Sequence, residues 1–150
     1  MRRKDRERDA AFAWEVFDKA SFGVLSLRDG EGGYGVPVSP ARIGERVYFH
    51  CAQSGKKLDC IAQWPQASLT VCEVAGFDYF GCKYQSAILT GEVSPVEDQA
   101  EKIEALRAIS EKYCPSDMAD FDQYLAPRLK TTAVCRIDVT EITGKERMPG

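Results

Sequence analysis

The sequence predicts an α+β fold that is mainly β: a small closed barrel of five or six mostly antiparallel strands, with peripheral helices, in one domain over residues 1–150. Three observations support this prediction. Short β-rich runs are separated by glycine-containing turns, and helical periodicity is confined to four segments. The chain of 150 residues also has the length of one ordinary domain.

The composition is that of a soluble globular protein. The 20 Lys+Arg and 23 Asp+Glu residues give a net charge of −3, and 44% of the residues are hydrophobic. No apolar run approaches the roughly 20 residues that a membrane span needs, and residues 1–9 contain no stretch that resembles a signal peptide. Basic and acidic residues alternate at the start of the chain, which favours a solvated helix start over a nucleic-acid-binding arm. We therefore expect a cytoplasmic protein with no membrane or nucleic-acid partner.

The cysteine and histidine content excludes the usual zinc sites. No Cys-x-x-Cys pair occurs, and His50 is the only histidine. Without a secretion signal, the six cysteines are interpreted as free thiols. The sequence therefore predicts no metal site.

The first third of the chain is predicted to form a helix and three strands. Residues 11–20 are amphipathic and predict a helix, residues 22–28 predict a strand, and the glycine-rich residues 29–33 predict a hairpin loop. Residues 34–38 continue as a second strand, and residues 46–51 form a third. Pro37 cannot donate a hydrogen bond to a neighbouring strand, so it is expected at an edge, a bulge or a bound ligand.

The remaining segments alternate between helix and strand. Residues 55–63, 97–113 and 117–125 have helical spacing, and Pro65 and Pro115 end the first two. Strands are predicted over residues 67–74, 85–96 and 131–142, the second of them bent or broken at Gly91. Ile103, Leu106 and Ile109 form a stripe on the longest helix that indicates packing rather than binding.

Gly55, Lys56 and Lys57 open a short helix directly after the third strand. Backbone N–H groups at a helix start, together with two ammonium groups, suit a phosphate, although the same residues also occur at solvated helix starts. The motifs GxxxxGK[ST] and GxGxxG do not occur, so neither a nucleoside triphosphatase nor a dinucleotide-binding Rossmann unit is supported.

In order and spacing, nine short pieces resemble the pyridoxamine 5′-phosphate oxidase-like, FMN-binding split-barrel proteins, especially the branch of nitroimidazole-resistance proteins. The pieces lie at residues 2–5, 22–26, 35–38, 47–52, 55–59, 83–86, 91–93, 105–106 and 142–145. This resemblance covers nearly the whole chain. It implies a six-stranded antiparallel Greek-key split barrel that forms a homodimer, with two FMN molecules in the clefts between the subunits.

The resemblance also assigns residues to the cofactor. The flavin ring is expected along the backbone of Val36, Pro37 and Val38, and Lys57 is expected to hold the phosphate. The other expected cofactor contacts are Phe49, His50, Cys51, Gly55 and Lys56, together with Lys83, Tyr84 and Ser86 from the partner subunit.

His50 has two interpretations. A single histidine in a strand is often a structural residue. With a pKa in the neutral range, His50 could instead be the catalytic residue that donates to a flavin or to a substrate nitro group, or the ligand of a heme iron.

Three functions follow from the resemblance. The first is an FMN-dependent oxidoreductase that reduces a small electrophile, such as a nitroimidazole, another nitroaromatic or a quinone, with NAD(P)H as a possible donor. The second is a non-catalytic protein that stores or senses flavin or heme. A true pyridoxamine-phosphate oxidase is disfavoured, because no arginine- and tryptophan-bearing C-terminal segment of the kind those enzymes use is found before Gly150.

Overall fold

Eight antiparallel strands form one sheet in the order β3-β2-β6-β7-β8-β5-β4, and β1 pairs with β8 beside this path. The computed structural model describes residues 2–148, so residues 1, 149 and 150 of the predicted domain lie outside the described residues. The strands are β1 Glu7–Arg8, β2 Gly23–Asp29, β3 Gly32–Val38, β4 Ala41–Ile43, β5 Arg46–Ala52, β6 Gln66–Asp78, β7 Gly81–Pro95 and β8 Thr132–Arg147.

Four α-helices and two 3₁₀ helices accompany the sheet. They are η1 Lys4–Arg6, α1 Ala10–Lys19, α2 Lys56–Gln63, α3 Gln99–Tyr113, η2 Pro115–Asp120 and α4 Phe121–Leu125. The segment predicted as one helix over residues 117–125 is therefore a 3₁₀ helix followed by a short α-helix. No helix in the described part of the chain is long and apolar enough to cross a membrane.

The predicted α+β, mainly β class is confirmed, and all six predicted strands are present. The sheet has two further strands, β1 with two residues and β4 with three. Neither was predicted, because two or three residues are too few to show the alternation that identifies a strand.

Two apolar clusters lie on the two faces of β5. Val47 and Phe49 face the barrel interior, where they belong to one cluster with Phe17 of α1 and Leu25 of β2. Tyr48 faces the other way and belongs to a second cluster with side chains of α3 and α4. Because side chains alternate along a strand, His50 lies on the face of Tyr48, and Cys51 lies on the face of Phe49.

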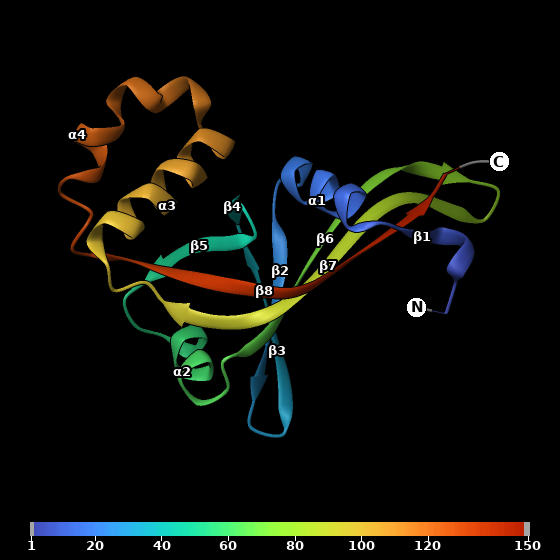
Figure 1. Cartoon of the computed structure of the whole chain (residues 1–150), viewed down its shortest axis with the longest axis horizontal. Helices are drawn as coiled ribbons and strands as arrows, with labels where there is room; N and C mark the ends of the chain where they lie inside the picture. The colour runs from blue at the N-terminus through green and yellow to red at the C-terminus, as the bar shows by residue number, and fades with distance from the viewer. Residues whose placement is uncertain (1, 149–150) are drawn as a thin grey trace.

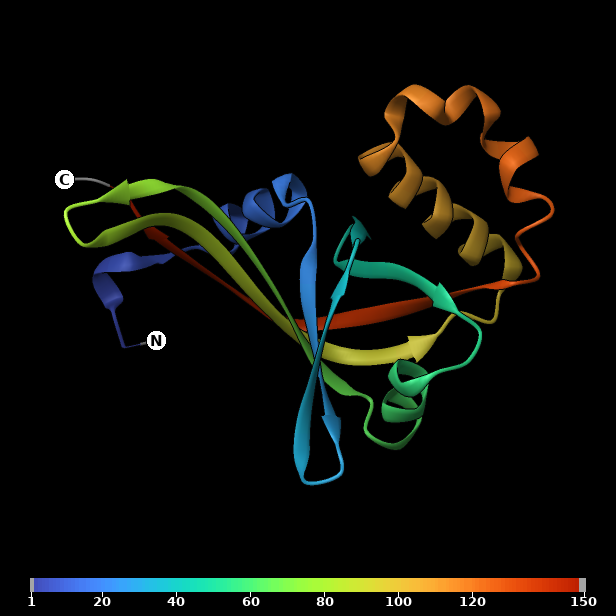
Figure 2. The same cartoon turned by 180° about the vertical axis from the view of Figure 1, so that it is seen from behind.

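The β6–β7 hairpin is longer at both strands than predicted and projects from the barrel as an arm, which here means residues 74–84. Figures 1 and 2 show this arm at one end of the molecule and α3 with α4 at the other. Register shifts mark two places along these strands, one between Val74 and Gly76 and one between Thr90 and Gly91. The irregularity predicted at Gly91 is therefore present.

Candidate functional site

A cavity of about 230 Å³ brings together the end of β3, the middle of β5 and the start of α2. It is lined by Phe22, Pro37, Val38, Ser39, His50 and Lys57. Four residues of the predicted site, Pro37, Val38, His50 and Lys57, therefore border one space although they are up to 20 positions apart in the sequence.

Pro37 lies on an edge strand, which is one of the three places that the sequence left open for it. β3 is the first strand of the sheet order and pairs only with β2, where Pro37 is opposite Val24. The missing N–H of Pro37 therefore leaves no neighbouring strand unpaired. Pro37 is exposed at this edge, whereas Val36 is half-buried and packs against the cluster in the barrel.

The start of α2 has backbone N–H groups that can bind an anion. Gly55 is the N-terminal cap residue and has a φ of 138°, a conformation that side chains disfavour. No side chain caps the helix, and no atom lies within 4 Å of the place where a Cβ of Gly55 would be. The first N–H groups of α2 are therefore open to a bound group.

The two lysines of this helix start point to different partners. Lys56 Nζ lies 2.7 Å from Asp29 Oδ2 and 4.7 Å from the centre of the Tyr34 ring, so it is engaged by the β2–β3 hairpin. Lys57 Nζ lies 5.7 Å from the centre of the Phe49 ring and lines the cavity. Within residues 2–148, Lys57 forms no ion pair with a carboxylate. Lys57 is therefore the cation available to an anion in this cavity.

His50 lies between this cavity and a second one. Partial burial of the imidazole, followed by the positive charge of Lys57, lowers the pKa of His50 below its ordinary value. The imidazole is therefore neutral at pH 7, with one nitrogen that donates and one that accepts a hydrogen bond.

The second cavity, which we call the α3–α4 pocket, has a volume of about 430 Å³ and a mainly apolar lining. Ser39 and His50 line both cavities, so the two spaces share a wall. The remaining lining residues come from α3, η2–α4 and the segments that follow them: Leu106, Ile109, Ser110, Tyr113, Cys114, Phe121, Tyr124, Leu125, Arg128 and Thr132.

The end of α3 is fixed to the chain that leaves β3. Tyr113 donates its hydroxyl hydrogen to the backbone oxygen of Pro40 at 2.7 Å, and Lys112 Nζ donates to the same oxygen at 3.1 Å. Lys112 also donates to the backbone oxygen of Phe17 at 3.0 Å. These bonds hold the α3–α4 pocket against Ser39 and therefore against the first cavity.

Phe49 and Cys51 lie on the opposite face of β5 from His50. The Phe49 side chain is fully buried in the barrel, and Cys51 packs against the same cluster. A hydrogen bond with the Cys135 thiol lowers the pKa of Cys51 and raises that of Cys135. Lys57 lowers the pKa of Cys51 further, whereas burial opposes this shift. The two thiols form a contact inside the barrel rather than a wall of either cavity.

Lys83, Tyr84 and Ser86 lie on β7, in or next to the arm, and none of them lines either cavity. Lys83 Nζ is 3.8 Å from Asp78 Oδ2, and Lys145 Nζ is 5.7 Å from the centre of the Tyr84 ring. Within one chain, the fold does not bring these three residues to Lys57 and His50.

Sequence reasoning missed Phe22 and the helical wall of the α3–α4 pocket. Tyr113 and Arg128 had no signal of their own, because an aromatic or a basic residue at a helix end is common in any domain. Among the described residues, no three His, Cys, Asp or Glu side chains form a group that could hold a metal ion.

Comparisons with known proteins complete the description of this site. Residues 9–146 match the sequence profile of the family described as pyridoxamine 5′-phosphate oxidase. No curated protein sequence matches the chain significantly.

Several solved structures have a similar fold. The flavocytochrome Anf3 from Azotobacter vinelandii has a TM-score of 0.82 at 22% identity, over 99% of this chain and 72% of that chain. An FAD- and heme-binding protein from Mycobacterium smegmatis has a TM-score of 0.82 at 16% identity, over 96% and 74%. A candidate 5-nitroimidazole antibiotic resistance protein from Bacteroides thetaiotaomicron has a TM-score of 0.76 at 21% identity, over 92% and 84%.

Proposed function

The chain belongs to the pyridoxamine 5′-phosphate oxidase family, and on this premise we propose that it is an FMN-dependent oxidoreductase that reduces a small electrophile. The proposed acceptors are a nitroimidazole, another nitroaromatic or a quinone, and the proposed donor is NAD(P)H. The observation that carries the proposal is the cavity shared by Lys57, His50 and the Pro37–Val38 end of β3.

The residues of this cavity fit FMN. The uncapped start of α2 and the Lys57 ammonium suit a phosphate, and the edge strand β3 offers backbone groups to a flat ring. A bound FMN would supply the hydride transfer, which no side chain of this protein can perform.

The side chains around the cofactor have separate tasks in this proposal. Lys57 holds the phosphate, and the backbone of Val36, Pro37 and Val38 orients the ring. His50, neutral at pH 7, donates a hydrogen bond to an oxygen of the substrate. The apolar side chains of the α3–α4 pocket exclude water beside it.

The protein is proposed to act as a homodimer. Lys83, Tyr84 and Ser86 are separated from Lys57 within one chain, so they contact the cofactor only when they come from a second copy. A twofold arrangement would make two equal sites, each with residues from both copies.

The absorption spectrum of freshly purified protein tests this proposal. The expected result is a flavin spectrum with bands in the near ultraviolet and the blue, and release of the flavin followed by chromatography identifies it as FMN or FAD. Turnover of NAD(P)H that depends on an added nitroaromatic or quinone is the second expected result. Protein that neither contains nor takes up flavin would contradict the proposal.

A second candidate is a protein that binds flavin or heme without turnover. It is supported by the α3–α4 pocket, whose volume is in the range of small-molecule sites and whose wall includes the only histidine. Two proteins of similar fold are described as a flavocytochrome and as an FAD- and heme-binding protein. A Soret band that is lost in His50→Ala would favour this candidate.

A further inference from the structure

The arm ends in an exposed group of aromatic side chains, which we call the aromatic tip: Phe77, Tyr79 and Phe80. Their exposed fractions are 81%, 95% and 103%. Aromatic rings bury more apolar area than most side chains and are enriched among the residues that dominate binding. Such a group on the surface indicates an interaction site.

The conformation of the turn supports this interpretation. Tyr79 and Phe80 have φ values of 26° and 62° and connect Asp78 to Gly81, which are paired across the hairpin. A two-residue turn with two positive φ values strongly favours Asn-Gly, because left-handed conformations are unfavourable for larger side chains. Two aromatic residues here reduce stability, so they are better explained by what they contact than by the turn itself.

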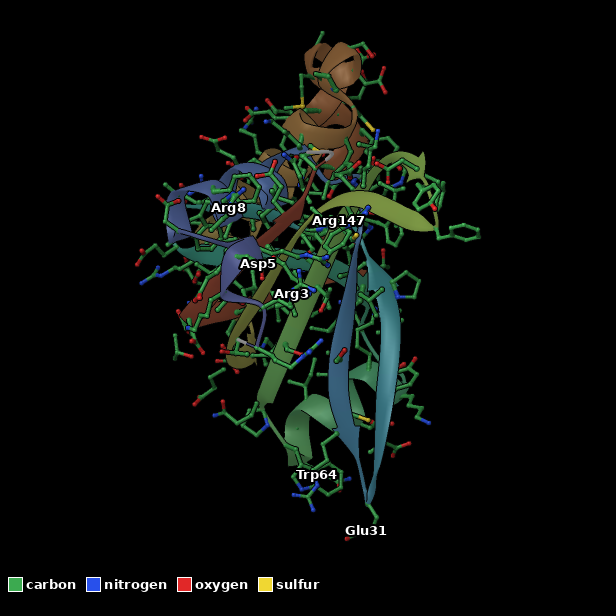
Figure 3. All side chains as sticks on the ribbon, turned by 90° about the vertical axis from the view of Figure 1, so that its right-hand side faces the viewer. Arg3, Asp5, Arg8, Glu31, Trp64 and Arg147 are labelled. Atoms are coloured by element: carbon green, nitrogen blue, oxygen red, sulfur yellow. The ribbon has the colours of Figure 1, made fainter. Side chains whose placement is uncertain are left out.

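The tip is held in place before it meets a partner. Arg147 Nη1 donates to the backbone oxygen of Cys82 at 2.8 Å and lies 3.2 Å from Asp78 Oδ1. A side chain at Gly81 would overlap the guanidinium of Arg147. Figure 3 shows Arg147 beside the strands of the arm, and Glu31 at the far end of the β2–β3 hairpin. Little conformational freedom is therefore lost when a rigid arm of this kind binds.

We propose that the aromatic tip of one copy closes the α3–α4 pocket of a second copy. The inference rests on the proposed dimer, because the same arm carries the residues that the dimer places at the partner's cofactor. The pocket offers an apolar surface of matching chemistry, formed by Ile109, Phe121 and Leu125, and the exposed Tyr124 also lines it. Twofold symmetry provides one tip for each of the two pockets.

This arrangement adds a wall to the substrate side of the proposed active site. His50 lines the α3–α4 pocket, and in this proposal the partner's aromatic rings cover the opening. A flat apolar substrate would then be held between rings of two copies, and the pocket would be complete only in the dimer.

The test is the double variant Tyr79→Asn/Phe80→Gly, compared with the unchanged protein by sedimentation over a range of concentrations. The dimer dissociation constant is expected to rise at least about thirtyfold, as the loss of an interface hot spot predicts. At concentrations where both proteins are monomeric, the variant is expected to unfold at a higher temperature, since Asn-Gly suits this turn. A purely structural role of the aromatic residues would give the opposite change in the monomer.

Two further variants make the test specific. Glu31→Ala, at the turn of the other hairpin, is expected to leave the dissociation constant unchanged. Phe80→Ala and Tyr124→Ala each raise the dimer dissociation constant. In the double variant, the rise is expected to be smaller than the product of the two separate rises, because the two substitutions remove the two sides of one contact.

The possible failures are distinct. A protein that is monomeric at all concentrations contradicts the proposed dimer and, with it, the docking of the tip. A dimer that persists in Tyr79→Asn/Phe80→Gly, or fully independent effects of Phe80→Ala and Tyr124→Ala, overturns the docking and leaves the proposed dimer intact.

Discussion

Lys57 and His50 line the same cavity, and the charge of the Lys57 ammonium contributes to the lowered pKa of the His50 imidazole. The proposed anchor of the phosphate thus also keeps the proposed substrate donor in its neutral form. A change at one residue is therefore expected to be measurable at the other.

Lys57→Ala is expected to raise the pKa of His50 toward its ordinary value of about 6.5, because one of the two causes of the shift is removed. The ring protons of the only imidazole can be titrated by NMR. Lys56→Ala is the matched control, since Lys56 is paired with Asp29, and it is expected to leave this pKa unchanged. Equal shifts in the two variants would contradict the assignment of Lys57 to the cavity.

The same shift predicts the pH dependence of stability. A lowered pKa means that the folded protein binds fewer protons at His50 than the unfolded chain does, so its stability rises with pH in this range. The free energy of unfolding is expected to fall as the pH decreases through about 6.5 and to approach a constant contribution below the folded pKa of His50. Chemical denaturation across this pH range should show that the free energy of unfolding falls less for His50→Ala than for the unchanged protein.

Lys57→Ala is also expected to weaken FMN binding by about ten- to a hundredfold. A hydrogen bond to a charged group contributes roughly 1.5–3 kcal/mol, and about 1.4 kcal/mol corresponds to a factor of ten. Riboflavin, which lacks the phosphate, should bind the two proteins almost equally in a fluorescence titration. If the affinity for riboflavin falls as much as that for FMN, Lys57 does not hold the phosphate.

His50→Ala separates the catalytic and structural interpretations of this residue. If His50 donates to the substrate, turnover falls while the melting temperature and most of the flavin content remain. If it is structural, the melting temperature falls and the activity per folded molecule is unchanged. Both quantities should be measured on one preparation.

Gly91→Ala is expected to destabilise the fold by roughly 1–3 kcal/mol, in the range of overpacked sites. A Cβ at this position would overlap the backbone oxygen of Asp138, beside the bulge where the register between β7 and β8 shifts. Gly33→Ala is the control, because no atom lies within 4 Å of the added Cβ and the backbone there is extended. Similar losses in the two variants would show that the bulge does not require glycine.

Tyr48→Phe tests how the second apolar cluster is joined to the sheet. The Tyr48 hydroxyl donates to Glu101 Oε1 at 2.9 Å, and Arg136 Nη1 donates to the same atom at 2.8 Å. The free energy of unfolding is expected to fall by about 1.5 kcal/mol at neutral pH, which is the lower end of the range for a hydrogen bond to a charged group. Arg136, and after it Tyr48, lower the pKa of Glu101, so this contribution is lost as the pH falls through that pKa. An equal loss at pH 7 and at strongly acidic pH would contradict this.

Much of the fold could be predicted from local patterns. The six longer strands have the alternation and the turns that identify them, and α1 and α3 have helical stripes. The arm was underestimated at residues 75–84 because none of these residues is fully buried, so apolar and polar residues do not alternate along it. The short strands β1 and β4 form because they pair with β8 and β5, and their few residues show no apolar–polar alternation.

By itself, the sequence determined the family resemblance, the strand class and the presence of a cation beside a glycine at a helix start, because these depend on residues close together in the chain. The tertiary structure decided that Lys57 rather than Lys56 lines the cavity, since Asp29 of a distant hairpin engages Lys56. It also decided that the Cys51 face of β5 turns toward the barrel interior and the His50 face away from it, and that Ser39 joins two cavities. Such relationships arise where segments far apart in the sequence pack together, and local periodicity has no information about which segments these are.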